Sequence, residues 1–351
     1  MIIRYTALIF FLLLTVASAS ENNNKLVFLN WPEYIHPDVI ASFEKKYSAD
    51  VHEVNYETDE LKEEMLLAND ARGFDVMVGS GITMVQYIKR RWIDRIQPED
   101  IPNLKHIKDR FKKIFPDLSN HAVPYLWGTL GIGYRKDKIA YPVTSWKDLF
   151  RPKETLRKKI LMINDSKDTI GAALKMCGHS LNSKTLAHYD QAFHILKYQL
   201  GFVKTYGYVD LENNSPLVTG EIWMAMMYNG DALALNEKNA NISFCIPSEG
   251  TNLWVDYLAI LSQSQNKPLA RAFINHILCP ENSAKNSMFL KYATPNQTAE
   301  THMSKSHLEN PIIYPPEKVL DHSEIYRNLP PKIIKKRNNI FLNIVHEANE
   351  R

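Results

Sequence analysis

Short apolar runs alternate with longer amphipathic stretches from Lys25 onward, and this alternation constrains the fold more than any other feature. Three of the runs predict strands, at residues 26–29, 51–56 and 74–78. Each is followed by a helix signal, beginning at Pro37, Thr58 and Thr83. Such alternation is typical of α/β proteins, in which parallel strands are joined by right-handed crossovers.

The same alternation returns in the second half of the chain. The predicted strands are residues 160–163, 222–227, 242–246 and 257–261, and the predicted helices are 170–176, 187–200 and 269–278. Two extended stretches without helical periodicity, 125–134 and 247–256, would carry the chain from one lobe to another. We therefore predict two discontinuous lobes with a cleft between them: residues 25–128 and 256–298 form lobe 1, and residues 129–255 and 299–345 form lobe 2.

Residues 1–19 have the features of a secretory signal peptide. Arg4 precedes an apolar run at residues 7–16, and Ala17-Ser18-Ala19 fits the small-x-small cleavage pattern. A run of ten apolar residues is too short to cross a hydrocarbon core of ~30 Å as a helix. We therefore predict cleavage after Ala19 and export of the mature chain.

Composition and motifs argue against several classes of protein. The chain has 42 basic and 39 acidic residues, and a formal net charge of +3 is too small a bias to indicate a nucleic-acid partner. Three cysteines, an odd number, do not suggest a disulfide scaffold. The sequence contains no Walker loop, HExxH, GxSxG or CxxC motif, and its histidines lack metal-ligand spacing. We therefore predict no catalytic residue, no cofactor and no metal site.

Aromatic and acidic residues follow the predicted strands or lie in the second extended stretch. They are Trp31, Tyr34, Asp165, Asp168, Tyr228, Trp254 and Asp256. Ligands of open α/β sheets bind beyond the carboxyl ends of the strands. Ring faces attract ammonium groups, and carboxylates add charge-assisted hydrogen bonds. The pattern therefore predicts a binding site for an organic cation.

Several of these residues also have a structural interpretation. Asp165 and Asp168 fit the N-cap and the first turn of the helix that follows them. This interpretation is compatible with ligand binding, because the positive helix end keeps both carboxylates ionised. Asp231 fits a helix cap better than a ligand-binding role, and Trp31 and Trp254 would each also suit a hydrophobic core.

Five motifs occur in a specific order and spacing. They are Asn30-Trp31-x-Glu33-Tyr34, Pro124-Tyr125-x-Trp127-Gly128 with Gly131-Ile132-Gly133, Thr144-Ser145-Trp146, Pro247-x-Glu249-Gly250 through Trp254-x-Asp256, and Tyr292-x-Thr294-Pro295-Asn296. Together they resemble the bacterial periplasmic spermidine/putrescine-binding proteins, the solute receptors of polyamine ABC transporters, over about residues 25–298. The resemblance implies an α/β, two-lobed type II periplasmic binding fold. Each lobe would be a mainly parallel sheet flanked by helices, with the ligand cleft between the lobes.

The resemblance also implies a site. Carried onto this sequence, the acids that hold the ammonium groups match Asp165, Asp168 and Asp256. The aromatic box around the methylene chain matches Trp31, Tyr34, Tyr228, Trp254 and Tyr292, and Glu33 is a further candidate. The ligand would be a linear polyamine such as spermidine, norspermidine or putrescine, bound by hinge closure in the periplasm.

The same resemblance implies a partner. A monomer that is not an enzyme would present its ligand to an inner-membrane ABC permease, or to a membrane-bound sensor that controls cyclic-di-GMP. The motifs do not separate transport from signalling.

The chain departs from the family pattern at three places. After the third predicted strand the family usually has Val-Pro-Ser followed by an aromatic residue, whereas this chain has 78–82 as Val-Gly-Ser-Gly-Ile. No counterpart of a glutamine near the family's C-terminus is found. Asp210 lies near a position that is often small and polar, and it is a fourth candidate acid. Four acids exceed the charge of a diamine, so a triamine is expected to bind better than putrescine.

Two other functions stay open at this point. The same fold could bind another small solute, such as ferric iron, thiamine or a sugar, although the sequence has no Tyr-Tyr pair of the kind an iron receptor favours. The chain could also be a secreted α/β enzyme, since a fold does not determine a function.

Overall fold

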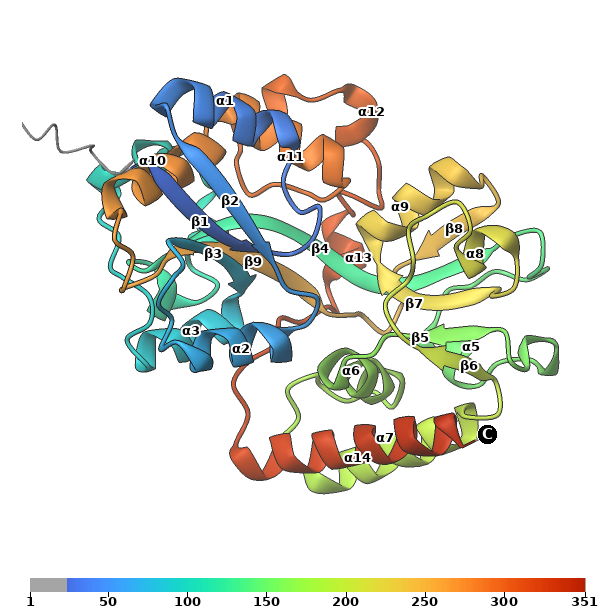
Figure 1. Ribbon diagram of the computed structural model, residues 1–351. Helices are drawn as coiled ribbons and strands as arrows, with labels where there is room; N and C mark the ends of the chain where they lie inside the picture. The colour runs from blue at the N-terminus through green and yellow to red at the C-terminus, as the bar shows by residue number, and fades with distance from the viewer. Residues whose placement is uncertain (1–23, 351) are drawn as a thin grey trace, which may run out of the picture.

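A computed structural model describes residues 24–350, and the predicted signal peptide lies outside them. Two antiparallel strands run side by side through the middle of the molecule, β4 (Ala122–Arg135) and β9 (Leu253–Ile260) (Figure 1). β4 is long enough to belong to two sheets: its first half pairs with β9, and its second half pairs with β7 and β8. β4 covers the first extended stretch, 125–134, whereas β9 joins the end of the second, 253–256, to most of the strand predicted at 257–261.

The first sheet has the strand order β2-β1-β3-β9-β4. Its other strands are β1 (Lys25–Asn30), β2 (Asp50–Asn55) and β3 (Val76–Ser80). β1 pairs in parallel with β2 and β3, whereas β9 is antiparallel to both of its neighbours. The connecting helices are α1 (Pro37–Tyr47), α2 (Asp59–Ala68) and α3 (Gly81–Lys89). This half confirms the predicted alternation of strands and helices.

The second sheet contains β8 (Ile242–Cys245), the end of β4, β7 (Met224–Tyr228), β5 (Ile160–Met162) and β6 (Val203–Tyr206). β5 pairs in parallel with β6 and β7, and β4 is antiparallel to β7 and β8. Its main helices are α6 (Ser166–Met176), α7 (Leu186–Gln199), α9 (Asn229–Lys238) and α14 (Pro331–Asn349). α14 packs against α6 and α7 at the bottom of Figure 1.

The remaining helices lie between these elements. The α-helices are α4 (Asp109–Lys112), α5 (Trp146–Phe150), α8 (Pro216–Thr219), α10 (Lys267–Ile277), α11 (Pro280–Leu290), α12 (Lys305–Leu308) and α13 (Glu317–Leu320). The 3₁₀ turns are η1 (Pro98–Asp100), η2 (Pro102–His106), η3 (Pro116–Leu118), η4 (Glu154–Leu156) and η5 (Ala299–His302).

Each sheet buries its own core. One hydrophobic cluster joins Phe28, Phe43 and Phe273 across the first sheet and its helices. A second cluster includes Trp146 and Tyr189, and a smaller third one lies beside it in the same half of the molecule. The C-terminal segment contributes to both halves: Ile313 belongs to the first cluster, and three isoleucines of α14, Ile333, Ile340 and Ile344, belong to the second. The residue at which the last lobe segment begins stays a prediction.

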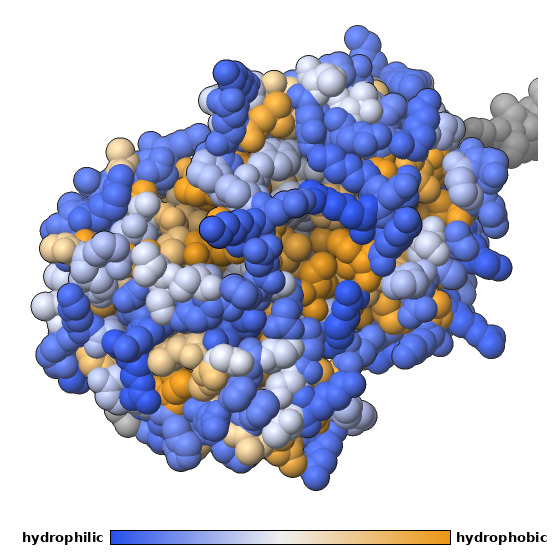
Figure 2. Space-filling model, turned by 180° about the vertical axis from the view of Figure 1, so that it is seen from behind, coloured by the Kyte–Doolittle hydropathy of each residue, from blue (hydrophilic) through white to orange (hydrophobic). Residues whose placement is uncertain are grey.

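The surface in Figure 2 shows apolar side chains gathered near the middle of the back face, between hydrophilic margins. Among the helices of residues 24–350, none combines the length and the apolarity that a membrane span requires. The three cysteines, which lie in that range, are not joined by a disulfide.

Candidate functional site

β9 places two predicted site residues on one face of the sheet. Trp254 and Asp256 are two residues apart, so their side chains point the same way, and Tyr257 points to the other face. Trp254 lies opposite Gly128 of β4. A Cβ atom at Gly128 would lie 2.5 Å from the Trp254 ring, so only glycine leaves room for the indole against this strand.

Four of the five predicted aromatic residues form one cluster. The Trp254 ring makes edge contacts with Tyr292 and Tyr228, with ring centroids 4.9 and 6.0 Å apart. The Tyr292 ring is 6.2 Å from that of Tyr34. Gly230 makes room for Tyr292 as Gly128 does for Trp254, because a Cβ atom there would lie 2.4 Å from the Tyr292 ring. The four rings come from distant parts of the sequence and meet where the lobes join.

The fifth aromatic residue, Trp31, is engaged elsewhere. Its ring lies 4.4 Å from that of Tyr56, and the ammonium of Lys62 sits 5.7 Å from its centroid. Tyr56 is fully buried and donates its hydroxyl hydrogen to the Val78 carbonyl, 2.9 Å away. Trp31 therefore faces a cation that the protein itself supplies.

Asp256 lies beside the aromatic cluster. The Tyr34 hydroxyl donates a hydrogen bond to one of its carboxylate oxygens, at 3.0 Å. Burial raises the pKa of Asp256 to about 6, against the hydrogen bond from Tyr34 and the nearby Lys62, which lower it. A cationic ligand group beside this carboxylate would therefore stabilise its ionised form.

Asp165 and Asp168 begin α6, as predicted. Asp165 is the N-cap, and its carboxylate accepts the backbone N–H groups of Lys167 and Asp168 at 2.7 and 2.9 Å. Asp168 is buried and accepts hydrogen bonds from the Tyr228 hydroxyl at 2.7 Å and the Asn252 amide at 3.2 Å. Burial and the neighbouring Asp165 raise the pKa of Asp168 to about 6. Tyr228 thus links this acid to the aromatic cluster.

An ion-pair network that the sequence did not indicate joins α2 to α6. Asp59 accepts Lys62 at 2.6 Å through one oxygen and Lys167 at 2.9 Å through the other. Lys167 also lies 3.7 Å from Asp165. Burial would raise the pKa of Asp59, but the two lysines hold it below its ordinary value. The network therefore ties the two lobes together through charged groups.

Two predicted site residues have exposed side chains. Glu33 and Asp210 are exposed, and the Asp210 carboxylate accepts the backbone N–H of Glu212 at 2.8 Å. The interpretation of Asp231 as a helix cap is wrong, because Tyr228 is the N-cap of α9. Asp231 instead accepts the Tyr292 hydroxyl at 2.8 Å, and burial raises its pKa to about 6.

A further aromatic residue comes from the C-terminal segment. The Tyr326 hydroxyl donates to the Lys167 carbonyl at 2.8 Å and lies beside Asp168, whose pKa it helps to lower. Gly171 makes room for this hydroxyl, since a Cβ atom there would lie 2.4 Å from it. Tyr326 stands in a polar stretch without strand or helix periodicity, so no signal in the sequence pointed to it.

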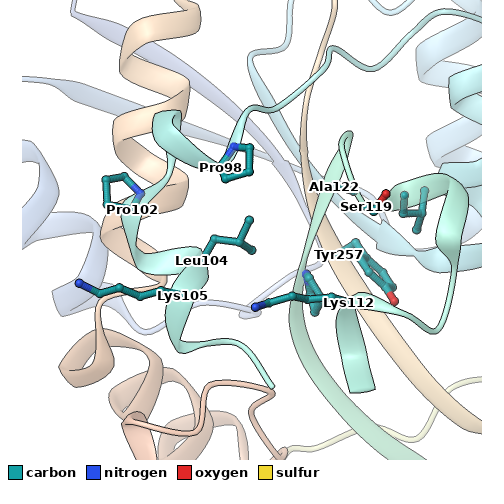
Figure 3. A pocket seen from close by; sticks show the side chains of 10 residues that line it. Pro98, Pro102, Leu104, Lys105, Lys112, Ser119, Ala122 and Tyr257 are labelled. Atoms are coloured by element: carbon teal, nitrogen blue, oxygen red, sulfur yellow. The ribbon is translucent and has the colours of Figure 1, made fainter. Parts of the chain in front are cut away.

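A separate pocket opens on the outer side of the first lobe. Its volume is about 350 Å³, and Tyr257 and residues of the α3–β4 connection, such as Leu104, Lys105 and Lys112, line it (Figure 3). Tyr257 reaches it from the face of β9 opposite Asp256. None of the predicted site residues lines this pocket.

The region between the lobes has the chemistry of an organic-cation site. Buried carboxylates of Asp168 and Asp256 lie at the margins of a ring cluster that offers π faces and hydroxyl donors. Within residues 24–350, no group of three or more His, Cys, Asp and Glu side chains is arranged to hold a metal ion. The arrangement suits binding of a cation with an apolar chain.

Comparison with known proteins agrees with this geometry. The pattern of the bacterial extracellular solute-binding proteins matches residues 38–312. The putrescine-binding periplasmic protein SpuD of Pseudomonas aeruginosa is 30% identical over 338 residues, which cover 90% of each chain. The norspermidine sensor of Vibrio cholerae is 29% identical over 333 residues, 94% of this chain and 90% of the sensor.

A solved structure is similar over nearly the whole chain. It is the crystal structure of the spermidine/putrescine ABC transporter substrate-binding protein PotD from Streptococcus pneumoniae, with a TM-score of 0.80 and 25% identity. The match covers 93% of this chain and 99% of that one. These similarities confirm the resemblance seen in the motifs and the predicted two-lobed periplasmic binding fold.

Proposed function

Because the chain belongs to the family of bacterial extracellular solute-binding proteins, we propose that it binds a linear polyamine by closing its two lobes around it. The single observation that carries this proposal is the pairing of a buried carboxylate, Asp168, and a half-buried one, Asp256, with one cluster of rings. Asp168 is hydrogen-bonded to Tyr228, which contacts Trp254, and Asp256 is hydrogen-bonded to Tyr34, which contacts Tyr292. Each acid would take one ammonium group, and the rings would enclose the methylene chain between them.

The proposed ligand site consists of Tyr34, Asp165, Asp168, Tyr228, Trp254, Asp256 and Tyr292. Asp168 lies on α6 of the second lobe, whereas Tyr34 and Tyr292 belong to the first. A bound dication would therefore bridge the two lobes. A ligand that contacts both lobes stabilises their closed arrangement over an open one. Glu33 and Asp210, which are exposed, are left out.

A membrane protein would be the partner that recognises this closed arrangement. We place the protein in the periplasm, where the relatives' names place several of them, and assign it binding rather than catalysis. An ABC permease and a sensor protein are both suitable partners, since the similar proteins include an ABC transporter substrate-binding protein and a norspermidine sensor. With either partner, ligand binding must change the affinity of this protein for that partner.

Isothermal titration of ligand-free protein tests the proposal. We expect putrescine or spermidine to bind with a Kd in the micromolar range or below, about −8 kcal/mol, and to raise the melting temperature. Glucose, thiamine and ferric citrate serve as controls for the other solutes of this fold, and none should bind comparably. Absence of heat and of a melting shift with every polyamine would refute the proposal.

Gly128→Ala should weaken polyamine binding roughly tenfold, within the range of a lost cation–ring contact. The new Cβ atom would lie 2.5 Å from the Trp254 ring and 2.4 Å from the Asn229 side-chain oxygen, so the indole must move. Gly207→Ala is the matched control, because nothing lies within 4 Å of a Cβ atom there. Titration of both variants checks this, and equal Kd values for the two would contradict it.

A further inference from the structure

Lys62 is a buried lysine whose partner, Asp59, also pairs with Lys167 of the second lobe. Its side chain is fully buried, and its ammonium lies 4.7 Å from the Tyr56 ring centroid and 5.7 Å from that of Trp31. Asp59 balances it at 2.6 Å. Rings on two sides and a carboxylate are the environment that the proposed site offers to a ligand ammonium, so this position is already taken by the chain.

The glycine that departs from the family pattern lies against this ammonium. A Cβ atom at Gly79 would lie 3.0 Å from the Lys62 ammonium, which is a tight contact. The end of β3 therefore leaves the space that the ammonium fills. The lysine and the glycine belong to one local arrangement.

Lys167 places a second resident cation among the same acids. Its ammonium lies 2.9 Å from Asp59 and 3.7 Å from Asp165. Burial lowers its pKa, but the carboxylates of Asp165 and Asp59 raise it well above its ordinary value. The group therefore stays charged at neutral pH.

These residues form one electrostatic unit with the two ligand-binding acids. Lys62, Asp59 and Lys167 act on Asp256, and Asp165 and Lys167 act on Asp168. Four carboxylates and two ammonium groups leave a formal charge of two negative units for a ligand to neutralise. Asp231 is held separately by the Tyr292 hydroxyl.

We propose that Lys62 and Lys167 act as resident counter-ions that make the site select a linear diamine over a triamine. This inference rests on the proposed polyamine-binding function. A diamine neutralises the charge that these six groups leave, whereas a triamine brings a third ammonium toward Lys62, which repels it. The further carboxylate nearby, Asp231, is bound by the Tyr292 hydroxyl. The sequence-based expectation that a triamine binds better counted Asp210, which is exposed, as a ligand-binding acid. It did not count the charges of Lys62 and Lys167.

Competitive titration with putrescine, cadaverine, spermidine and norspermidine tests the inference. The unmodified protein should bind a diamine at least tenfold tighter than either triamine. Lys62→Met keeps the length of the stem and removes the charge, and Lys167→Met removes the other resident charge. In each variant the preference for diamines should fall at least tenfold. Lys46→Met is the matched control, since Lys46 is exposed and lies 5.2 Å from the Tyr47 ring on α1.

The outcomes separate this inference from the function on which it rests. Polyamine binding with a triamine preferred, or a diamine preference unchanged in whichever lysine variants fold, overturns the counter-ion role and leaves the proposed function standing. Failure of all four polyamines to bind the unmodified protein overturns the proposed function and the inference together. A reduced diamine preference in Lys46→Met as well would overturn the counter-ion role, because the effect would then not be local to the site.

Discussion

Asp256→Asn should weaken polyamine binding more than any other single substitution in the proposed site, by about 30-fold or more. The carboxylate is half-buried and accepts one hydrogen bond, from Tyr34 at 3.0 Å, which an asparagine oxygen can also accept. The substitution therefore removes the charge and keeps the local structure. Deleting one partner of a buried hydrogen-bonded charge pair costs on the order of 2–5 kcal/mol, because the other charge stays buried without its counter-ion.

Asp210→Asn is the control for Asp256→Asn. It makes the same chemical change at an acid that the sequence motifs also suggested, but whose side chain is exposed. Titration of both variants with the tightest-binding polyamine should show a Kd close to that of the unmodified protein for Asp210→Asn alone. A folded Asp256→Asn protein that binds as tightly as its parent would place the ammonium-binding acids elsewhere.

The order of strands and helices could be predicted because each buries apolar residues at its own period. The runs before Asp165 and Tyr228 form β5 and β7, the first extended stretch forms most of β4, and the end of the second forms the start of β9. α11 was missed, since its buried positions are small and polar, among them Asn282, Ser283 and Asn286. Such residues pack well beside a neighbouring helix but leave no apolar stripe in the sequence.

The site was predictable where function and local structure leave the same signal. Asp165 and Asp168 stand at a helix start, and Trp254 and Asp256 alternate along a strand, so spacing alone placed each pair. Lys62 was not predictable, because a lysine three residues after an aspartate on a helix normally lies in solvent. Only the tertiary contacts with Tyr56 and Trp31 reveal that it is buried.

The departure at Gly79 shows how one observation can change meaning between sequence and structure. In the sequence, residues 78–82 marked the loss of an aromatic residue that the family has in this loop. In the structure, Gly79 of the same segment lies beside the ammonium of Lys62. The charge available to a ligand, rather than the number of rings, is then the property that distinguishes this site.

Polyamine affinity should fall about 100-fold as the pH is lowered from 7 to 5. Burial raises the pKa of Asp256 to about 6, and burial and Asp165 do the same for Asp168. A bound ammonium favours the ionised carboxylate and lowers both values, so binding is strong above pH 6 and weakens as the pH falls through it. Each group contributes about tenfold over this interval, since a proton must leave before the ammonium pairs with the acid.

The neighbouring charged groups do not reverse the expected fall in affinity at low pH. The lysines hold the pKa of Asp59 below its ordinary value, so it stays ionised, and the acids keep Lys167 protonated across the same interval. Titration at pH 7 and 5, with buffers of different ionisation enthalpy at pH 6, measures both the affinity and the protons released. Asp256→Asn should lose about a tenfold share of the pH dependence and part of the proton release. A Kd that is constant from pH 7 to 5 would mean that neither carboxylate contacts the ligand, because a group whose protonation competes with the ligand must appear in the pH profile.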